Sequence, residues 1–335
     1  MKKSQHLNES PFVALSSPGM HNIATNVLRI IREKHAVTIP HHQVTFDWFS
    51  NREVKSYVEK TVRRQHVIYF HPLQQPTPND AVMMMLLGND AIMRASAASI
   101  SLVLPYMCFL RQDRKDKERV PISARTLANL IESNRKVEQI ITADMHADQE
   151  QGFFDIPVDN LSSRPLFAEY FRNMFNGDLS NVVVVAPDYG GAVRARRFAL
   201  KLGDVPVAIF EKSRPKANQS EILSQGGDPV EGRIAIIYDD MIDTGGTIRG
   251  VVAELKARGA REVYVCATHG IFSGNAEENF ARSGFPVLVT NSIPRDPAYA
   301  EKHKNWLTIV PMDELLAEAV YEASLIGGSV SKLSK

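Results

Sequence analysis

Cysteine is scarce in this sequence, with only Cys108 and Cys266 among 335 residues. Both lie within apolar runs, which favours small buried side chains in a reducing compartment over a disulfide or a metal pair. The adjacent His41 and His42 have no cysteine or carboxylate partner beside them, so we expect a surface turn there instead of a metal site. Folds stabilised by disulfides are therefore not expected.

Long apolar runs and an excess of one charge are also missing. No stretch approaches the roughly 18 consecutive apolar residues that a membrane helix needs. The N-terminal MKKSQHLNESPF has two lysines but no apolar core behind them, so we expect no signal peptide. The formal net charge is +1, which argues against a general attraction to nucleic acid. We expect a soluble cytoplasmic protein without a membrane or nucleic-acid partner.

What the sequence does contain is an alternation of short β-branched runs and amphipathic stretches. Helical spacing is clearest in 247–258, at Ile248, Val251, Val252 and Leu255. Strands that are apolar on both faces and alternate with helices indicate an α/β fold with doubly wound, parallel sheets. The expected strands are 12–15, 66–70, 100–104, 138–142, 181–186, 205–210, 233–238, 262–267, 287–290 and 308–310.

This pattern runs through the chain twice, at about 12–142 and 181–290, with a polar, proline-containing segment between the two series. We therefore expect two similar domains, at residues 10–160 and 161–307, with 308–325 packing back on the first. The polar stretch 212–231 has two prolines, two glycines and no periodicity. A loop of this length favours a mobile active-site lid.

The segment Asp239-Asp240-Met241-Ile242-Asp243-Thr244-Gly245-Gly246-Thr247 stands between an apolar strand and a helical pattern. Glycines after a strand let backbone N–H groups approach a phosphate, and the positive end of the next helix favours the anion. The two acids would repel phosphate, so they fit vicinal sugar hydroxyls or a magnesium ion. The combination predicts a ribose 5-phosphate site, the alternative being a tight turn with an exposed acid pair.

Three other polar segments follow expected strands, where the ligand crevice of an open α/β sheet lies. In the first, Arg111 and Gln112 offer donors for a triphosphate and a base. The second and third contain His146 and Asp188, which can bind magnesium directly or through its water shell. Taken singly, each of these residues would more often have a structural or solvated role.

The order of these motifs resembles the ribose-phosphate pyrophosphokinase family over about residues 12–331. The acid pair with TGGT is shared with type I phosphoribosyltransferases, whereas DMHADQEQGFFDIPVD resembles the signature of the pyrophosphokinases alone. The resemblance implies two domains with the type I phosphoribosyltransferase fold, the first binding nucleotide and the second binding ribose 5-phosphate. It also implies Mg²⁺-dependent transfer of the β,γ-diphosphate of ATP to the sugar 1-hydroxyl, giving 5-phosphoribosyl 1-diphosphate and AMP.

The family's functional residues fall on matching positions of this sequence. Its catalytic lysine and arginine fall on Lys212 and Arg214, where cations would stabilise charge on the transferring phosphoryl oxygens. The ribose 5-phosphate site falls on Arg214, Asp239, Asp240, Asp243, Thr244, Gly245, Gly246 and Thr247. The ATP site falls on Phe49, Asn51, Glu53, Arg111, Gln112 and His146, and the metal site on His146 and Asp188.

The loop around Phe49 departs from the family's F-S-D-G-E sequence. Asn51 replaces an acidic acceptor with an amide, and Arg52 replaces a glycine, while Phe49 can still stack on a base and Glu53 can still accept a hydrogen bond. A wider nucleotide range is therefore our hypothesis. In the family this loop serves the adenine pocket of a neighbouring subunit, which implies a homo-oligomer, either a hexamer or a smaller even assembly.

Two other functions stay open. The altered Asn51 and Arg52 motivate a non-catalytic regulatory subunit, although such a protein has no chemical need for Lys212 or His146. A type I phosphoribosyltransferase is the other alternative, and it leaves the polar segments of the first domain without a role. Ser329-Val330-Ser331 resembles a regulatory region that binds phosphate or ADP between subunits, the alternative being a frayed polar tail.

Overall fold

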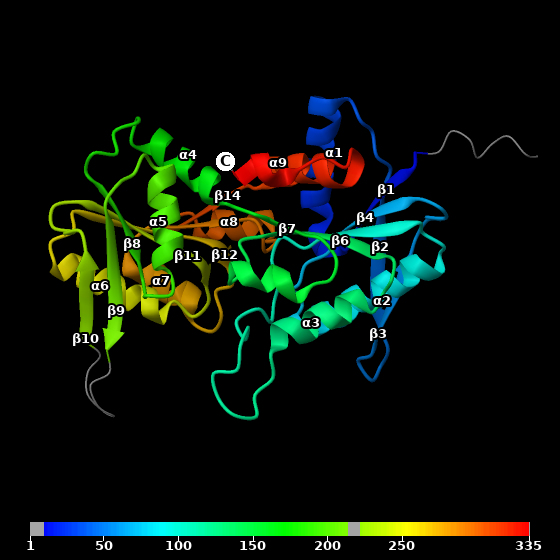
Figure 1. The fold of residues 1–335 in the computed structure, drawn as a ribbon, viewed down its shortest axis with the longest axis horizontal. Coiled ribbons are helices and arrows are strands. Elements are labelled where there is room, and N and C mark those ends of the chain that lie inside the picture. Colours follow the sequence, from blue (N-terminus) through cyan, green and yellow to red (C-terminus); the bar gives the residue numbers. More distant parts are fainter. Residues whose placement is uncertain (1–9, 214–221, 335) are drawn as a thin grey trace, which may run out of the picture. The chain divides into compact units, whose positions relative to one another are not determined.

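The computed structural model describes residues 10–213 and 222–334. They divide into two compact units, each built around one seven-stranded sheet (Figure 1). Unit 1 comprises Met1–Ser162 and Asp313–Lys335, and unit 2 comprises Ser163–Met312. The chain therefore leaves unit 2 after Met312 and returns to unit 1.

The sheet of unit 1 has the strand order β3-β2-β1-β4-β5-β6-β7, and its neighbours are parallel except for the antiparallel pair β2–β3. The strands are β1 (Phe12–Ser16), β2 (His41–Trp48), β3 (Val54–Val58), β4 (His66–Phe70), β5 (Ser99–Val103), β6 (Val137–Ala143) and β7 (Val158–Leu161). The α-helices are α1 (His21–His35), α2 (Pro78–Arg94), α3 (Ser123–Glu132) and α9 (Asp313–Ala319), the last followed by a π-helical turn, Val320–Leu325.

The sheet of unit 2 repeats this topology in the order β10-β9-β8-β11-β12-β13-β14, with β9–β10 as the antiparallel pair. The strands are β8 (Val182–Ala186), β9 (Val207–Ser213), β10 (Ile222–Gly227), β11 (Ile234–Ile242), β12 (Glu262–Gly270), β13 (Val287–Thr290) and β14 (Leu307–Val310). The helices are α4 (Arg164–Met174), α5 (Ala192–Lys201), α6 (Gly246–Ala257), α7 (Ala276–Ser283) and α8 (Pro297–His303). Across the described ranges, no helix is both long and apolar enough to cross a membrane.

Burial on both faces of the central strands explains their continuous apolar sequences. Every residue of β8, Val-Val-Val-Val-Ala, is buried. Val183 and Val185 belong to one core cluster and Val182 and Val184 to another, as the alternation of side chains along a strand requires. The α/β fold with two doubly wound, mostly parallel sheets is confirmed. Both cysteines are free and buried, and burial raises the pKa of the Cys108 thiol to about 12.

The polar edges of the sheets differ from the sequence prediction. The stretch 212–231, expected as one long loop, contains β10, which pairs antiparallel with β9. The edge strands β3 and β7 of unit 1 were likewise not expected, and neither was β2, which lies between β3 and β1. At a sheet edge, a strand has one unpaired side and can tolerate polar and glycine residues, as in the sequence ILSQGG of β10.

The expected surface turn at His41 and His42 is also wrong. Both residues begin β2, and both are half-buried. His41 Nε2 lies 2.9 Å from Ser16 Oγ, and its ring stacks on His21 with the ring centroids 5.1 Å apart. Burial, followed by the neighbouring His21, lowers the pKa of His41 to about 4. His41 therefore has a structural role in the packing of β2.

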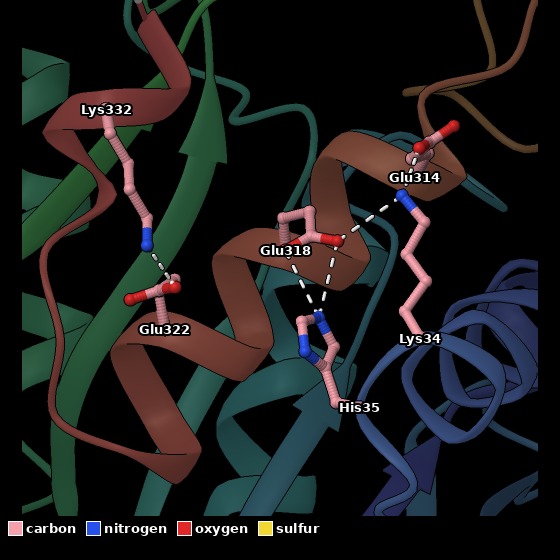
Figure 2. Close-up of polar contacts among 6 residues, drawn as sticks. All are labelled: Lys34, His35, Glu314, Glu318, Glu322 and Lys332. Atoms are coloured by element: carbon pink, nitrogen blue, oxygen red, sulfur yellow. Dashed lines mark hydrogen bonds and ion pairs between the residues drawn. The ribbon is translucent and has the colours of Figure 1, made fainter.

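The returning C-terminal segment packs against α1 (Figure 1, red beside blue). Glu318 of α9 accepts from His35 Nε2 at 3.2 Å and pairs with Lys34 Nζ at 3.4 Å, and Lys34 also pairs with Glu314 (Figure 2). The His35 ring stacks on Tyr321 with the ring centroids 3.6 Å apart. A mixed polar and aromatic contact thus fastens the end of the chain to unit 1.

Candidate active site

The acid pair lies inside strand β11, not beyond its end. The sequence placed the strand end at Tyr238, but pairing with β12 continues through Asp239 and on to Ile242. Asp240 is 3% exposed, and the side chain of Asp239 is 20% exposed. The two carboxylates therefore lie at the carboxyl end of a central strand. Hydrogen bonds to β12 hold the backbone of this segment on one side.

The turn from β11 to α6 has the geometry of an anion-binding loop. Gly245 adopts φ +72°, and a Cβ atom there would lie 2.4 Å from Cζ of Phe280, so the position requires glycine on two counts. Helix α6 begins at the next residue, and its first turn carries no acidic side chain. Gly246 and Thr247 are exposed there. The N–H groups and positive end of α6 can therefore receive a phosphate.

Arg194 of α5 contacts both acids, a contact that the sequence did not reveal. Its Nη1 donates to Asp239 Oδ1 at 2.7 Å and lies 3.2 Å from Asp240 Oδ1. Burial raises the pKa of the Asp239 carboxyl, the adjacent Asp240 raises it further, and Arg194 opposes both effects. The net direction is upward, because one guanidinium does not offset two acids that are mostly withdrawn from water.

Asp188 lies in the loop between β8 and α5. One of its oxygens, Oδ1, accepts from Gly191 N at 2.9 Å, and the residue is exposed. Strand β8 lies between β9 and β11, so successive connections leave it in opposite directions. Ligands of open α/β sheets bind at such a switch point, outside the carboxyl ends of the strands. The loop of Asp188 and the turn of Gly245 flank this point in unit 2.

Of the two residues expected to be catalytic, one lies within the described part of the chain. The backbone of Lys212 belongs to β9, where it pairs with Leu223 of β10. Strand β9 is the parallel neighbour of β8 on the side away from β11. Arg214 lies outside the described residues.

In unit 1, two of the expected nucleotide-binding segments lie beyond neighbouring strands. Arg111 and Gln112 follow β5, and His146 follows β6, which pairs with β5 in parallel. Gln149 Nε2 lies 3.5 Å from Asp113 Oδ2, so the two loops touch. His146 is half-buried and Arg111 is exposed. The structure thus brings these segments together at one edge of the sheet.

The third expected nucleotide-binding segment is the tight turn that joins β2 and β3. Phe49 N donates to Glu53 O at 2.8 Å, and Asn51 Oδ1 accepts from Glu53 N at 3.1 Å. The ring of Phe49 is 52% exposed, with Lys55 Nζ 5.0 Å from its centroid. Arg52 adopts φ +69°, the left-handed region that a glycine would adopt without strain.

The donor set suits magnesium that arrives with a nucleotide, not a protein-enclosed metal centre. Within the described ranges, no group of three or more His, Cys, Asp or Glu side chains could hold a metal ion. Mg²⁺ keeps several waters and is commonly bound by one or two carboxylates together with substrate phosphates. The exposed carboxylate of Asp188 fits that pattern, and a histidine such as His146 fits it through water or the nucleotide.

Comparison with known proteins agrees with these motifs in both units. A family model described as the N-terminal domain of ribose phosphate pyrophosphokinase matches residues 17–134, and a phosphoribosyl transferase domain model matches residues 159–296. The ribose-phosphate pyrophosphokinase of Vibrio cholerae is 42% identical over 311 residues, which are 92% of this chain and 96% of the relative. That of Vibrio parahaemolyticus is 44% identical over 278 residues, or 82% and 86% of the two chains.

A solved structure is similar over almost the same length. The phosphoribosylpyrophosphate synthetase from Mycobacterium smegmatis superimposes with a TM-score of 0.78 and 33% sequence identity. The match covers 92% of this chain and 97% of the other. The similarity therefore includes both units, not the phosphoribosyl transferase domain alone.

Proposed function

The chain belongs to the ribose-phosphate pyrophosphokinase family, and we propose that it transfers the β,γ-diphosphate of ATP to the 1-hydroxyl of ribose 5-phosphate with Mg²⁺. The products are 5-phosphoribosyl 1-diphosphate and AMP. The observation that carries this proposal is the β11–α6 site, a buried acid pair followed by a glycine turn and a helix N-terminus. It stands in a chain whose relatives match both units.

The β11–α6 site forms the acceptor half of the proposed active site. The 5-phosphate binds at the turn 243–247, where backbone N–H groups and threonine hydroxyls donate to it. The sugar hydroxyls donate to Asp239 and Asp240, because carboxylates accept hydrogen bonds from vicinal hydroxyls and repel phosphate. This division of roles fixes the orientation of the sugar along β11.

The donor half uses the polar loops of unit 1. Arg111 and Gln112 donate to the triphosphate, and His146 contacts the nucleotide or its metal-bound water. Mg²⁺, bound together with the nucleotide near Asp188, neutralises phosphate charge. Lys212 and Arg214 donate to the transferring phosphoryl oxygens, where negative charge builds up in the transition state.

The base is recognised at the β2–β3 turn. Phe49 stacks on the purine, and Asn51 and Glu53 accept from its amino group. The exposure of Phe49 suits a loop that reaches into the adenine pocket of a second copy in a homo-oligomer, a hexamer or a smaller even assembly. The proposal also includes a phosphate or ADP regulatory site at Ser329–Ser331, where Ser329 Oγ lies 3.1 Å from Ser331 Oγ.

The test is a coupled assay of both products. Purified protein is incubated with Mg²⁺, ATP and ribose 5-phosphate, and AMP and phosphoribosyl diphosphate are followed together. We expect equal amounts of the two products, and a loss of at least about a hundredfold in Lys212→Ala. Lys302→Ala, which removes an exposed lysine from α8, is the matched control and should keep full activity. Wild-type protein without stoichiometric AMP, or Lys212→Ala with normal turnover, would contradict the proposal.

A further inference from the structure

Arg194 connects the segment that follows β8 to the acid pair of β11 through ion pairs with both carboxylates. It lies on α5, the helix that follows the Asp188 loop. Its Nη1 bridges two carboxylates, at 2.7 Å from Asp239 Oδ1 and 3.2 Å from Asp240 Oδ1. The side chains of Arg194 and Asp239 are 19% and 20% exposed, so water screens this contact only in part.

Two hydrogen bonds converge on one oxygen of the Asp239 carboxylate. Oδ1 accepts from Arg194 and from the backbone N–H of Asp240 at 2.9 Å. The guanidinium and the backbone therefore fix the plane of the carboxylate through this oxygen.

Two adjacent acids in a largely buried position need such a counter-charge. Without a cation, like charges favour protonation of one carboxyl or rotation of one away from the other. A protonated or rotated carboxyl accepts hydrogen bonds from vicinal hydroxyls less well than a fixed carboxylate. An arginine that bridges both acids opposes both outcomes, and its two contacts hold the carboxyl groups in one orientation.

We propose that Arg194 is a positioning residue of the ribose site, which sets the affinity for ribose 5-phosphate by holding Asp239 and Asp240 in one orientation. This inference rests on the proposed function, since it assigns the acids to the sugar hydroxyls. A positioning residue differs from a structural ion pair in the quantity that its loss changes. A structural pair alters the stability of the fold, whereas a positioning residue alters the KM of one substrate.

The experiment compares the KM values of the two substrates in wild-type protein and three variants. In Arg194→Ala we expect the KM for ribose 5-phosphate to rise at least about tenfold, with the KM for ATP within about twofold of wild type. Arg194→Lys keeps the charge and loses the planar guanidinium, so a smaller rise is expected. Arg196→Ala is the matched control, because Arg196 lies on the same helix and pairs with Asp204 in an exposed position.

The outcomes separate this inference from the function on which it rests. If wild-type protein forms no phosphoribosyl diphosphate, the proposed function fails first. If wild type and Arg196→Ala are active and Arg194→Ala keeps the wild-type KM for ribose 5-phosphate, only the role of Arg194 is overturned. Equal rises in both KM values would also overturn it. If Arg194→Ala does not fold, Arg194→Gln replaces it, and a wild-type KM in that variant has the same meaning.

Discussion

Ionisation of the Asp239 carboxyl has a cost to the stability of the fold. Burial first, and the neighbouring Asp240 second, raise the pKa of its carboxyl above the ordinary value of 3.8. A raised pKa in the folded protein means that folding favours the protonated form. The associated stability is complete below the ordinary pKa and is lost as the pH rises through the folded value. At neutral pH the acid pair is therefore kept at some expense of stability.

Asp239→Asn should lose activity and gain stability in a pH-dependent manner. The amide stays neutral at every pH, so the variant avoids the like-charge repulsion that wild type acquires as the pH rises. We expect a gain of on the order of 1 kcal/mol in the free energy of unfolding at about pH 9, and little gain at about pH 5. Denaturant unfolding at the two pH values measures it. Asp204→Asn, at an exposed site, should show no such trend, and an equal gain at both pH values would contradict the explanation.

Arg52 carries backbone strain in the β2–β3 turn. Its φ of +69° costs a residue with a side chain about 1 kcal/mol relative to glycine. Arg52→Gly should therefore raise the free energy of unfolding by about 0.5 kcal/mol, because the greater freedom of glycine in the unfolded chain offsets part of the relief. Arg63→Gly is the control, since Arg63 is exposed and is not among the residues with positive φ. Arg63→Gly should lower the free energy of unfolding. If Arg52→Gly lowers it too, the backbone of Arg52 is not strained.

At the scale of elements, the two sheets share one topology but have different residues at the carboxyl ends of the corresponding strands. In unit 2 the switch point between β8 and β11 has the acid pair and the glycine turn at its rim. In unit 1 the corresponding strands are β1 and β4, and buried side chains close their ends. Ser17 Oγ lies 2.6 Å from His71 Nδ1 and 3.0 Å from the Tyr69 hydroxyl. The expected nucleotide residues of unit 1 lie elsewhere, beyond β5 and β6 and at the β2–β3 turn.

The predictability of these elements followed their burial. Central strands such as β8 are apolar on both faces and could be read directly from the sequence. The edge strand β10 could not, because one open side relaxes the demand for apolar residues. The acid pair and the glycine turn at 239–247 could be recognised because these residues are contiguous in the sequence, and their binding of ribose 5-phosphate stays a prediction. Arg194 could not be recognised, because its contact depends on β8 and β11 being neighbours, a long-range pairing that local patterns do not encode.

The turn between β11 and α6 should tolerate no side chain at Gly245. Alanine there meets both an unfavourable φ of +72° and the ring of Phe280 at 2.4 Å. We expect Gly245→Ala to lower the free energy of unfolding by about 2–4 kcal/mol and to weaken ribose 5-phosphate binding. Gly274→Ala is the control, since φ is +61° and nothing lies within 4 Å, so only the backbone cost applies. Equal losses in the two variants would mean that contact with Phe280 has no effect.

In the whole molecule, the C-terminal segment belongs to the same unit as the N-terminal part of the chain. Residues from Asp313 onward belong to unit 1, although the preceding strand β14 completes the sheet of unit 2. Glu318 lies at the centre of the contact with α1, within reach of both Lys34 and His35 (Figure 2). The covalent path thus passes from unit 1 to unit 2 and back.

Glu318→Gln tests how much the contact between α9 and α1 contributes to the stability of the fold. The glutamate side chain is 23% exposed, and Lys34 is 43% exposed, so solvent screens the pair. We expect a loss of about 0.5–1 kcal/mol in the free energy of unfolding, with activity kept. Glu301→Gln, which affects an exposed pair with Lys304 on α8, should change stability less. No difference between the two variants would show that the polar contact adds nothing beyond the packing of Tyr321.

The proposed diphosphate transfer is tested most directly by identifying the product that carries the β and γ phosphates of ATP. Phosphorus NMR of the reaction with Mg²⁺, ATP and ribose 5-phosphate distinguishes a diphosphate on the sugar from free phosphate, and AMP from ADP. We expect one phosphoribosyl diphosphate for each AMP, with the β and γ phosphorus atoms still joined through their bridging oxygen. ADP as the product, or AMP without a diphosphate on the sugar, would contradict it.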